Sequence, residues 1–268
     1  MNLGHKCRHA RRFALPTFNY PQLSDTKAVI ARAREAGVAL MQTISTQRSD
    51  FAQVKALAEA HPEIYCSIGI HPHEAAPHED ISEEELLREA AHPRVIGIGE
   101  TGLDYYYEHS PREVQRALFR RHIRVARALD CRSSSIAATP TRRRSISCAK
   151  AMEEGAFRFL IHCFSSTKYL SEESVKFGGY ISCSGILTFK KSQPLRDAVA
   201  DVPLESLLVE TDSPYLAPEP FRGKPCEPAY TKLTAERLAE VKGVSFEEIA
   251  QATTANFFRL FTKARLPA

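Results

Sequence analysis

The sequence predicts an α/β protein built from parallel βα units, and two observations carry this prediction. From Asp25 onward, short β-rich runs alternate with longer stretches whose apolar residues recur at helical spacing. Six strands are visible and the spacing leaves gaps for two more, which gives the number of a (β/α)8 barrel. The 268 residues suffice for one large core, and no repeat or low-complexity linker divides them, so we expect a single domain over 1–268.

The expected strands are short apolar runs: Ala39–Thr43, Tyr65–Gly69, Val95–Gly99, Phe157–Ile161, Tyr180–Cys183 and Leu207–Glu210. The expected helices are amphipathic stretches: Asp25–Ala36, Asp50–Ala60, Ser82–Ala90, Arg112–Leu129, Leu195–Val202, Thr231–Val241 and Ser245–Phe261. Asp25 and Ser82 are side chains of the kind that cap helix N-termini, which supports the starts of the first and third helices.

Two windows, residues 1–17 and 131–150, break this alternation. Neither holds an acidic residue, and together they hold nine of the 36 basic residues, which leaves 27 basic against 32 acidic residues elsewhere. The formal charge of +4 therefore belongs to these windows and does not indicate a nucleic-acid-binding face. The segment before Phe18 and the segment after Cys131 lack both alternation and an apolar run, so we expect loop or irregular strand there.

The seven cysteines and the hydropathy suggest a compartment. The cysteines are scattered without a Cys-x-x-Cys pair, which favours reduced thiols over a disulfide framework or a zinc knuckle. No run of about 18 apolar residues is present, and the first residues lead into Arg and His instead of an apolar signal core. We expect a cytoplasmic protein with no membrane contact and no obligatory protein partner.

Three strands are followed directly by residues that bind metals. Glu100 follows the strand at 95–99, His162 follows the strand at 157–161, and Asp212 follows the strand at 207–210. Each residue alone is equally typical of a solvated loop, a core histidine or a turn. Because the carboxyl ends of parallel strands meet at one mouth of a barrel, the three together predict a shared site for a divalent ion.

A fourth segment, Ile70-His71-Pro72-His73, adds imidazoles at the same rim. The His-x-His spacing resembles a metal-binding pair, but Pro72 imposes an extended or turning path. Metal ligation, contact with a phosphate or other substrate group, and a purely structural loop all remain open at this point.

Five segments, in this order and spacing, resemble the TatD family of metal-dependent DNases. They are Gly-Ile-His71-Pro-His, Gly-Glu100-Thr-Gly-Leu-Asp-Tyr-Tyr, Ile-His162-Cys-Phe-Ser, Glu-Thr-Asp212-Ser-Pro-Tyr-Leu-Ala-Pro and Thr-Ala-Asn256-Phe-Phe-Arg-Leu-Phe. The resemblance implies a single (β/α)8 TIM-type barrel of the metal-dependent hydrolase kind. It also implies a 3′–5′ exonuclease acting on DNA, single-stranded or at 3′ ends.

The resemblance also assigns roles at the site. Glu100 would bridge or ligate metal, His162 would ligate it, and Asp212 would ligate it and help to orient the attacking water, so Glu100 and Asp212 are the expected catalytic residues. One or two ions of Mg2+, Mn2+ or Zn2+ are implied. The expected substrate contacts are His71, His73, Asp104 and Tyr106.

The chain departs from the family pattern at two strands. The family's first strand ends in Asp-Ser-His-x-His, and a later strand ends in Ile-His-x-Arg-Asp, but neither motif is present here. With suitable synonymous codons, a one-base shift from Cys131 reads Leu-Pro-Leu-Val-Val-His-Ser-Arg-Asp-Ala-Asp-Glu-Glu-Thr-Leu. A similar shift through residues 8–15 reads Val-Met-Leu-Val-Asp-Ser-His-Cys. We interpret both windows as frameshifted, so that the first and fifth strands are degraded; a divergent relative with fewer ligands is the alternative.

Two other functions remain compatible with the sequence. The same barrel and metals could cleave an ester or an amide, because a fold does not set the substrate. The chain could also be a catalytically dead binding protein, since the ligands of the missing motifs are absent.

Overall fold

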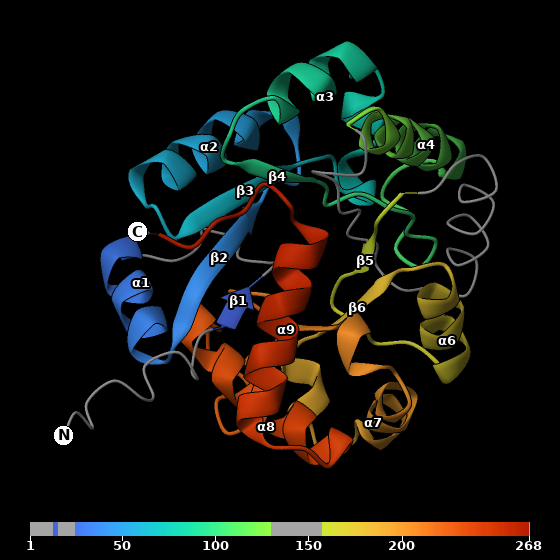
Figure 1. Ribbon diagram of the computed structural model, residues 1–268. Helices are drawn as coiled ribbons and strands as arrows, with labels where there is room; N and C mark the ends of the chain where they lie inside the picture. The colour runs from blue at the N-terminus through green and yellow to red at the C-terminus, as the bar shows by residue number, and fades with distance from the viewer. Residues whose placement is uncertain (1–12, 16–24, 130–156, 268) are drawn as a thin grey trace.

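The computed structural model describes residues 13–15, 25–129 and 157–267, and their strands form two parallel sheets (Figure 1). The first sheet has the order β1–β2–β3–β4 and the second the order β5–β6–β7. Every pairing in both sheets is parallel. The strands are β1 (Phe13–Leu15), β2 (Val38–Ile44), β3 (Ile64–Ile68), β4 (Val95–Ile98), β5 (Leu160–Ile161), β6 (Tyr180–Cys183) and β7 (Leu207–Val209).

The helices surround these strands in chain order, as the parallel connections require. In Figure 1, α1 to α4 and α6 to α8 follow one another around the outside, and α9 lies in front of the strands. The helices are α1 (Thr26–Glu35), α2 (Phe51–Ala60), α3 (Glu83–Ala90), α4 (Arg112–Ala128), α6 (Lys168–Lys176), α7 (Gln193–Ala200), α8 (Thr231–Lys242) and α9 (Phe246–Leu260). The expected caps are present: Asp25 Oδ1 accepts from Ala28 N at 3.0 Å, and Ser82 Oγ accepts from Glu85 N at 3.0 Å.

The strands curve around one interior, which is the arrangement of the predicted (β/α) barrel. β1 lies near β7, so the two sheets approach each other on that side. One residue from each of β2 to β7 points inward and joins one buried cluster with the end of α9. Its members are Leu40, Tyr65, Ile96, Leu160, Tyr180, Leu208, Phe257, Leu260, Phe261 and Ala264.

This cluster fills the end of the barrel at which the strands begin, so the polar side chains lie at the end at which the strands finish. Side chains alternate along a strand, so residues two and four positions beyond the cluster also face the interior but lie closer to the carboxyl ends. Glu210 and Asp212 stand in this relation to Leu208, and His162 stands in it to Leu160. With α9 covering the amino-terminal end, these polar side chains are directed to the opposite mouth.

Most expected elements are confirmed with their ends displaced by one to three residues. The helix α6 was not predicted, because its sequence Lys-Tyr-Leu-Ser-Glu-Glu-Ser-Val-Lys has few apolar residues. Before Phe18, where loop or irregular strand was expected, Phe13–Leu15 forms a three-residue strand that pairs with β2. The register of that pairing is irregular between Phe13 and Ala14. The rest of residues 1–17 and all of 131–150 lie outside the described residues.

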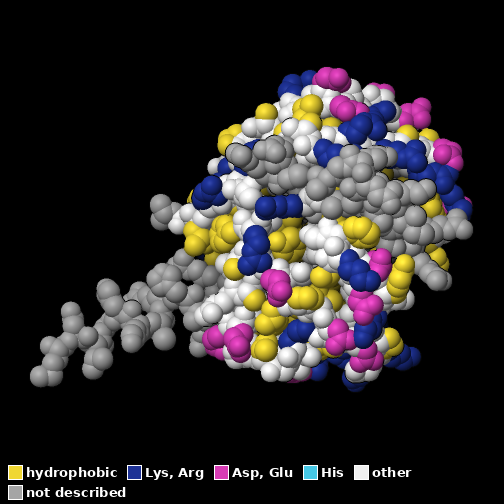
Figure 2. Space-filling view, turned by 45° about the vertical axis from the view of Figure 1, so that its right-hand side comes forward, with side chains coloured by type: hydrophobic (Ala, Val, Ile, Leu, Met, Phe, Trp, Pro, Cys, Tyr) yellow, Lys and Arg dark blue, Asp and Glu magenta, His cyan; other side chains and the backbone are white. Residues whose placement is uncertain are grey.

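The surface agrees with the near balance of charges outside the two windows. Figure 2 shows Lys and Arg side chains interspersed with Asp and Glu side chains on this face, without a large patch of either sign. Among the described residues, no helix has the length and apolar character needed to cross a bilayer.

Candidate functional site

The three residues predicted to share a metal ion are brought together by the structure. His162 directly follows β5, Glu100 follows β4 and Asp212 follows β7, so each stands at a carboxyl end. His162 Nε2 lies 3.4 Å from Asp212 Oδ1 and 3.9 Å from Glu100 Oε1. The imidazole nitrogen therefore faces both carboxylates at one mouth of the barrel.

Glu210, which the sequence did not reveal as a site residue, contacts the other nitrogen of this imidazole, Nδ1. Its Oε1 lies 2.7 Å from His162 Nδ1 and also accepts from the backbone N–H of Cys163 at 2.9 Å. Glu210 is fully buried, and burial raises the pKa of its carboxyl group. The alternation Leu208, Glu210, Asp212 was the available signal, because it places both acidic residues on the inward face of one strand.

The surroundings of His162 favour its charged form when only protein groups are present. Burial opposes the charge, but the carboxylates of Glu210, Glu100 and Asp212 outweigh burial and raise the pKa of His162 well above its ordinary value. Binding of a cation at Nε2 must therefore displace a proton. With Nδ1 facing Glu210, Nε2 is the nitrogen presented to the mouth.

Two glycines allow β3 and β4 to approach each other beneath Glu100. A side-chain carbon at Gly69 would lie 2.5 Å from Gly99 Cα and 2.8 Å from the Glu100 carbonyl oxygen. Gly69 is also fixed on its other side, where its N–H donates to Ser45 Oγ at 2.9 Å and its carbonyl accepts from the same hydroxyl at 3.2 Å. The position of Glu100 thus depends on the missing side chain at Gly69.

His71 lies on the other side of Glu100. Its Nε2 is 3.8 Å from Glu100 Oε1, while its Nδ1 accepts from the backbone N–H of His73 at 3.2 Å. Burial lowers the pKa of His71, so the ring is neutral near pH 7. A neutral ring that accepts at Nδ1 carries its proton at Nε2, and this geometry favours a hydrogen-bond donor at the mouth over a metal ligand.

The loop that carries His71 is anchored to α4 by His122, which the sequence analysis did not single out. His122 Nε2 accepts from the backbone N–H of Ile70 at 3.2 Å, and its Nδ1 lies 2.9 Å from the Leu118 carbonyl oxygen. The ring is completely buried, and burial lowers its pKa to about 4. His122 therefore serves as a neutral bridge between α4 and the residue preceding His71.

His73 and Asp104 pair with each other. His73 Nε2 lies 2.6 Å from Asp104 Oδ2, and Asp104 Oδ1 accepts from the backbone N–H groups of Tyr106 at 2.8 Å and Tyr107 at 3.2 Å. Burial opposes the charge on Asp104, but His73 and these N–H groups outweigh it and lower the pKa of the carboxyl group. The pair thus fixes the loop that presents Tyr106, whose side chain is 82% exposed.

The donor set fits a divalent cation in kind. Carboxylates suit Mg2+ and Mn2+, and imidazole suits Zn2+. Two donors bound to one ion at about 2.1 Å lie roughly 3 to 3.5 Å apart; the His162–Asp212 distance of 3.4 Å falls in this range and the His162–Glu100 distance of 3.9 Å slightly exceeds it. Within the described ranges, no group of three or more His, Cys, Asp or Glu side chains is arranged to hold an ion as it stands. Glu100, His162 and Asp212 would thus supply part of a coordination shell.

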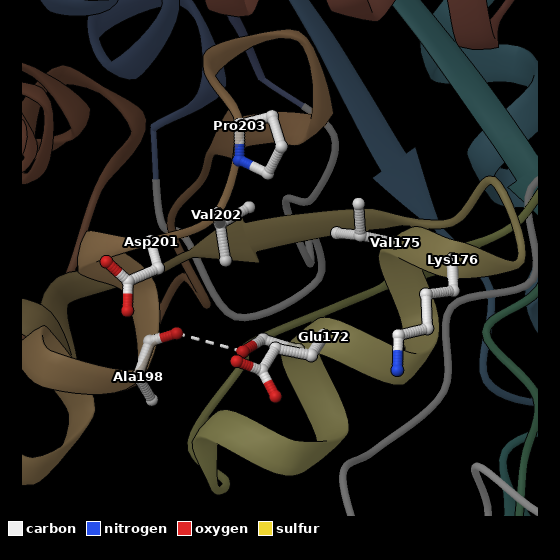
Figure 3. A pocket seen from close by; sticks show the side chains of 8 residues that line it. Glu172, Val175, Lys176, Ala198, Asp201, Val202 and Pro203 are labelled. Carbon is white, nitrogen blue, oxygen red and sulfur yellow. Dashed lines mark hydrogen bonds between the residues drawn. The ribbon is translucent and has the colours of Figure 1, made fainter.

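A separate groove lies on the outer surface between α6 and α7 (Figure 3). Its volume is about 380 Å³, and it is lined by residues such as Glu172, Lys176, Asp201 and Pro203. The Ser171 hydroxyl donates to the Ala198 carbonyl at 2.8 Å and joins the two helices at its floor. None of its lining residues belongs to the mouth, so we assign it no part in the chemistry.

Comparison with known proteins places this fold among the metal-dependent hydrolases. Residues 17–262 match the family model of TatD related DNases. The chain is 36% identical over 241 residues to YabD of Bacillus subtilis, an uncharacterized metal-dependent hydrolase, covering 89% of this chain and 93% of that protein. It is 37% identical over 237 residues to YcfH of Escherichia coli K12, also an uncharacterized metal-dependent hydrolase, covering 88% of each. The crystal structure of YjjV, a TatD homolog from Escherichia coli K12, has a TM-score of 0.85 at 29% identity and covers 94% of this chain and 98% of that one. The chain belongs to the TatD family of metal-dependent hydrolases.

Proposed function

We propose that this chain is a deoxyribonuclease of the TatD type that removes nucleotides from the 3′ end of DNA. The observation that carries the proposal is the position of His162 Nε2, which faces both Asp212 and Glu100 at the mouth of the barrel. A divalent ion held there by Glu100, His162 and Asp212 would lower the pKa of a bound water and neutralise charge on a phosphate oxygen.

The exposure of the two carboxylates separates their roles. The Asp212 side chain is 28% exposed, whereas the side chains of Glu100 and His162 are 8% and 5% exposed. Asp212 is the carboxylate that solvent reaches, so it orients the attacking water and accepts its proton. Glu100 lies deeper and contributes negative charge to the ion site. His71, which carries a proton at Nε2, donates it as a hydrogen bond to a phosphate oxygen.

We also propose that the protein is cytoplasmic. In the part of the chain that the structure describes, Cys66, Cys163, Cys183 and Cys226 are free thiols. Burial raises the pKa of Cys66 and of Cys183 to about 12, which keeps both in the unreactive thiol form. Free buried thiols are typical of a reducing compartment.

The test compares two labels on one single-stranded oligonucleotide. The chain as written and a version with both windows in the restored frame are incubated with Mg2+ or Mn2+, with and without chelator, on DNA labelled at either the 3′ or the 5′ end. With the restored version we expect the 3′ label to appear first as a mononucleotide and the 5′ label to mark a shortening ladder, and both signals to stop with chelator.

A matched pair of variants links this activity to the site. Asp212→Asn should abolish digestion, whereas Glu227→Gln, which removes a carboxylate paired with Arg32 near the surface, should leave it intact. An aryl ester is assayed in parallel. Chelator-sensitive ester cleavage without digestion of any DNA would overturn the proposal in favour of an ester hydrolase on the same barrel.

A further inference from the structure

Exposed aromatic side chains gather at the mouth of the barrel. Five large apolar or aromatic side chains are exposed among the described residues: Tyr106 (82%), Tyr107 (64%), Tyr169 (55%), Tyr215 (54%) and Leu266 (44%). The first two follow β4 in the loop that holds Asp104. Tyr215 follows β7, and its N–H donates to the Asp212 carbonyl at 2.7 Å. Tyr106, Tyr107 and Tyr215 thus border the site. Exposed aromatic side chains that gather in one place are typical of a binding surface, whereas single ones scattered over a protein are not.

The loop after β4 is held in one shape. Gln115 on α4 accepts from the N–H of Asp104 at 2.7 Å and donates to its carbonyl at 3.0 Å, while the Asp104 carboxylate accepts from the next N–H groups. Tyr106 and Tyr107 meet edge to face at 4.8 Å, and Tyr107 stacks on His109 at 5.9 Å with an interplanar angle of 13°. We name Tyr106, Tyr107 and His109 the aromatic shelf; its rings are presented on a fixed backbone, which limits the entropy lost on binding.

The loops after β6 and β7 carry exposed cations. Lys190 and Lys191 follow β6, and Arg222 and Lys224 lie in the long segment that follows β7; we name these four side chains the basic ledge. In residues 185–192 and 213–226, Glu219 is the single acidic residue of the sequence. The ledge therefore presents an excess of positive charge next to the site.

The two loops of the ledge are packed together. A side-chain carbon at Gly185 would lie 2.1 Å from the Leu216 carbonyl oxygen, so the backbones are in close contact there. Thr188 Oγ1 accepts from the Glu219 N–H at 2.9 Å. The Arg222 guanidinium of the loop after β7 lies over the Phe189 ring of the loop after β6, 4.4 Å from its centroid. This contact holds the two loops together.

We propose that the shelf and the ledge form a path for single-stranded DNA across the mouth, with bases stacked on the aromatic shelf and phosphates lying along the basic ledge. The proposal rests on the proposed nuclease function and identifies which residues select the strand. Aromatic faces stack on any unpaired base, and a basic track follows the backbone without reading sequence. In a duplex the base faces are already stacked on their neighbours, so the shelf favours unpaired ends.

Binding is measured without cleavage, by fluorescence anisotropy of a labelled oligothymidylate in the absence of divalent metal at several salt concentrations. Tyr106→Ala with Tyr107→Ala removes two rings of the shelf, and we expect binding weaker by about tenfold or more, since stacking contributes 1–3 kcal/mol per base and 1.4 kcal/mol is tenfold. The ledge variant removes all four cations: Lys190→Ala, Lys191→Ala, Arg222→Ala and Lys224→Ala. It should make the plot of log K against log salt less steep, by about 0.7 for each phosphate that the protein no longer neutralises.

Matched controls remove the same groups elsewhere. Tyr169→Ala on α6 removes a comparably exposed ring, and the four substitutions Lys168→Ala, Lys176→Ala, Lys232→Ala and Arg237→Ala remove four cations from α6 and α8. Neither control should change affinity for the single strand by more than about twofold. Urea unfolding of every variant identifies any that fail to fold, and the single substitution Lys191→Ala then replaces the quadruple variant.

The possible outcomes distinguish a failure of the proposed DNA path from a failure of the proposed nuclease function. Weaker single-strand binding in the shelf variant, a smaller salt slope in the ledge variant and unchanged controls support the path. If the protein digests DNA but shelf and ledge variants bind as the unsubstituted chain does, the path is wrong and the nuclease stands. Equal reductions of affinity in the controls overturn it as a non-specific charge effect. Failure of the unsubstituted chain to bind single-stranded DNA overturns the path, and failure of the version with both windows restored to digest any DNA overturns both proposals.

Discussion

His162 Nδ1 lies 2.7 Å from Glu210 Oε1, and this pairing directs the opposite nitrogen of the ring at Asp212 and Glu100. The carboxylate is completely buried and its Oε1 also accepts from the Cys163 N–H, so neither partner of the pair is free to rotate. A histidine that donates its second N–H to a carboxylate is held in one tautomer and becomes a more basic ligand. Glu210 therefore positions His162, and through it the proposed metal site.

The first prediction concerns this pairing. Glu210→Gln keeps the shape of the side chain but removes its charge, so we expect the affinity for Mn2+ or Zn2+ to fall by about 10- to 100-fold. Titration calorimetry measures the affinity directly. Glu227→Gln, at the ion pair with Arg32, is the matched control and should bind metal normally. Unchanged metal affinity in Glu210→Gln would show that the pairing is only structural.

The second prediction concerns His122 and pH. Its pKa is lowered to about 4 from an ordinary value of 6.5, so the unfolded chain binds a proton between these pH values and the folded chain does not. Stability from this group is complete above pH 6.5 and is lost as pH falls towards 4, by up to about 3 kcal/mol at 1.36 kcal/mol per pKa unit. Urea unfolding at pH 7.5, 6 and 5 should show this loss.

Two variants isolate the contribution of His122. His122→Gln should be less stable at pH 7.5, because the N–H of Ile70 loses its buried partner, and its stability should depend less on pH below 6.5. His61→Gln, at a partly exposed position, should keep the pH dependence of the unsubstituted chain. Identical pH dependence in the His122→Gln variant would count against this assignment.

The third prediction concerns the close approach beneath Glu100. Gly69→Ala places a carbon 2.5 Å from Gly99 Cα, and the opposing atoms are backbone, so β4 must move. We expect a loss of stability of about 1–3 kcal/mol and weaker metal binding, since Glu100 moves with the strand. Gly178→Ala is the control, because the position has open space but a φ of +75°. It should cost about 1 kcal/mol of stability and leave metal binding unchanged.

The sequence predicted the outer layers of the fold better than the interior contacts of the site. β2 to β4 and the helices packed on them carry regular apolar patterns, and these patterns are a local property of the chain. Glu100, His162 and Asp212 were found because each follows an apolar run, so their strand positions were visible in the sequence.

The missed residues share a different physical origin. Glu210 and His122 act through contacts between distant segments, across 48 and 52 positions of the chain. The strand alternation indicates that Glu210 faces inward but not that it contacts His162, and no local pattern distinguishes His122 from an ordinary polar residue. β1 was expected only as loop or irregular strand for a related reason: its three residues become a strand through pairing with β2 and not through their own alternation. Predictions for the remainder of 1–17 and for 131–150 stay predictions.

The last prediction concerns these two windows. As written, the chain offers Glu100, His162 and Asp212 at the mouth, and these three side chains are fewer than two ions need. The histidines of the missing first-strand and later-strand motifs would complete the shell, and the restored strands would fix its geometry. We therefore expect weak metal binding and little nuclease activity in the chain as written.

The restored version should gain both metal binding and nuclease activity. In this version residues 131–145 read Leu-Pro-Leu-Val-Val-His-Ser-Arg-Asp-Ala-Asp-Glu-Glu-Thr-Leu, and residues 8–15 read Val-Met-Leu-Val-Asp-Ser-His-Cys. Metal content after dialysis and digestion of 3′-labelled single-stranded DNA measure the difference. A third version, with the restored windows but Ala at both of their histidines, separates ligand number from strand packing: it should regain stability without regaining metal. Equal metal content and equal chelator-sensitive activity in the written and restored chains would contradict the claim that these windows hold the missing ligands.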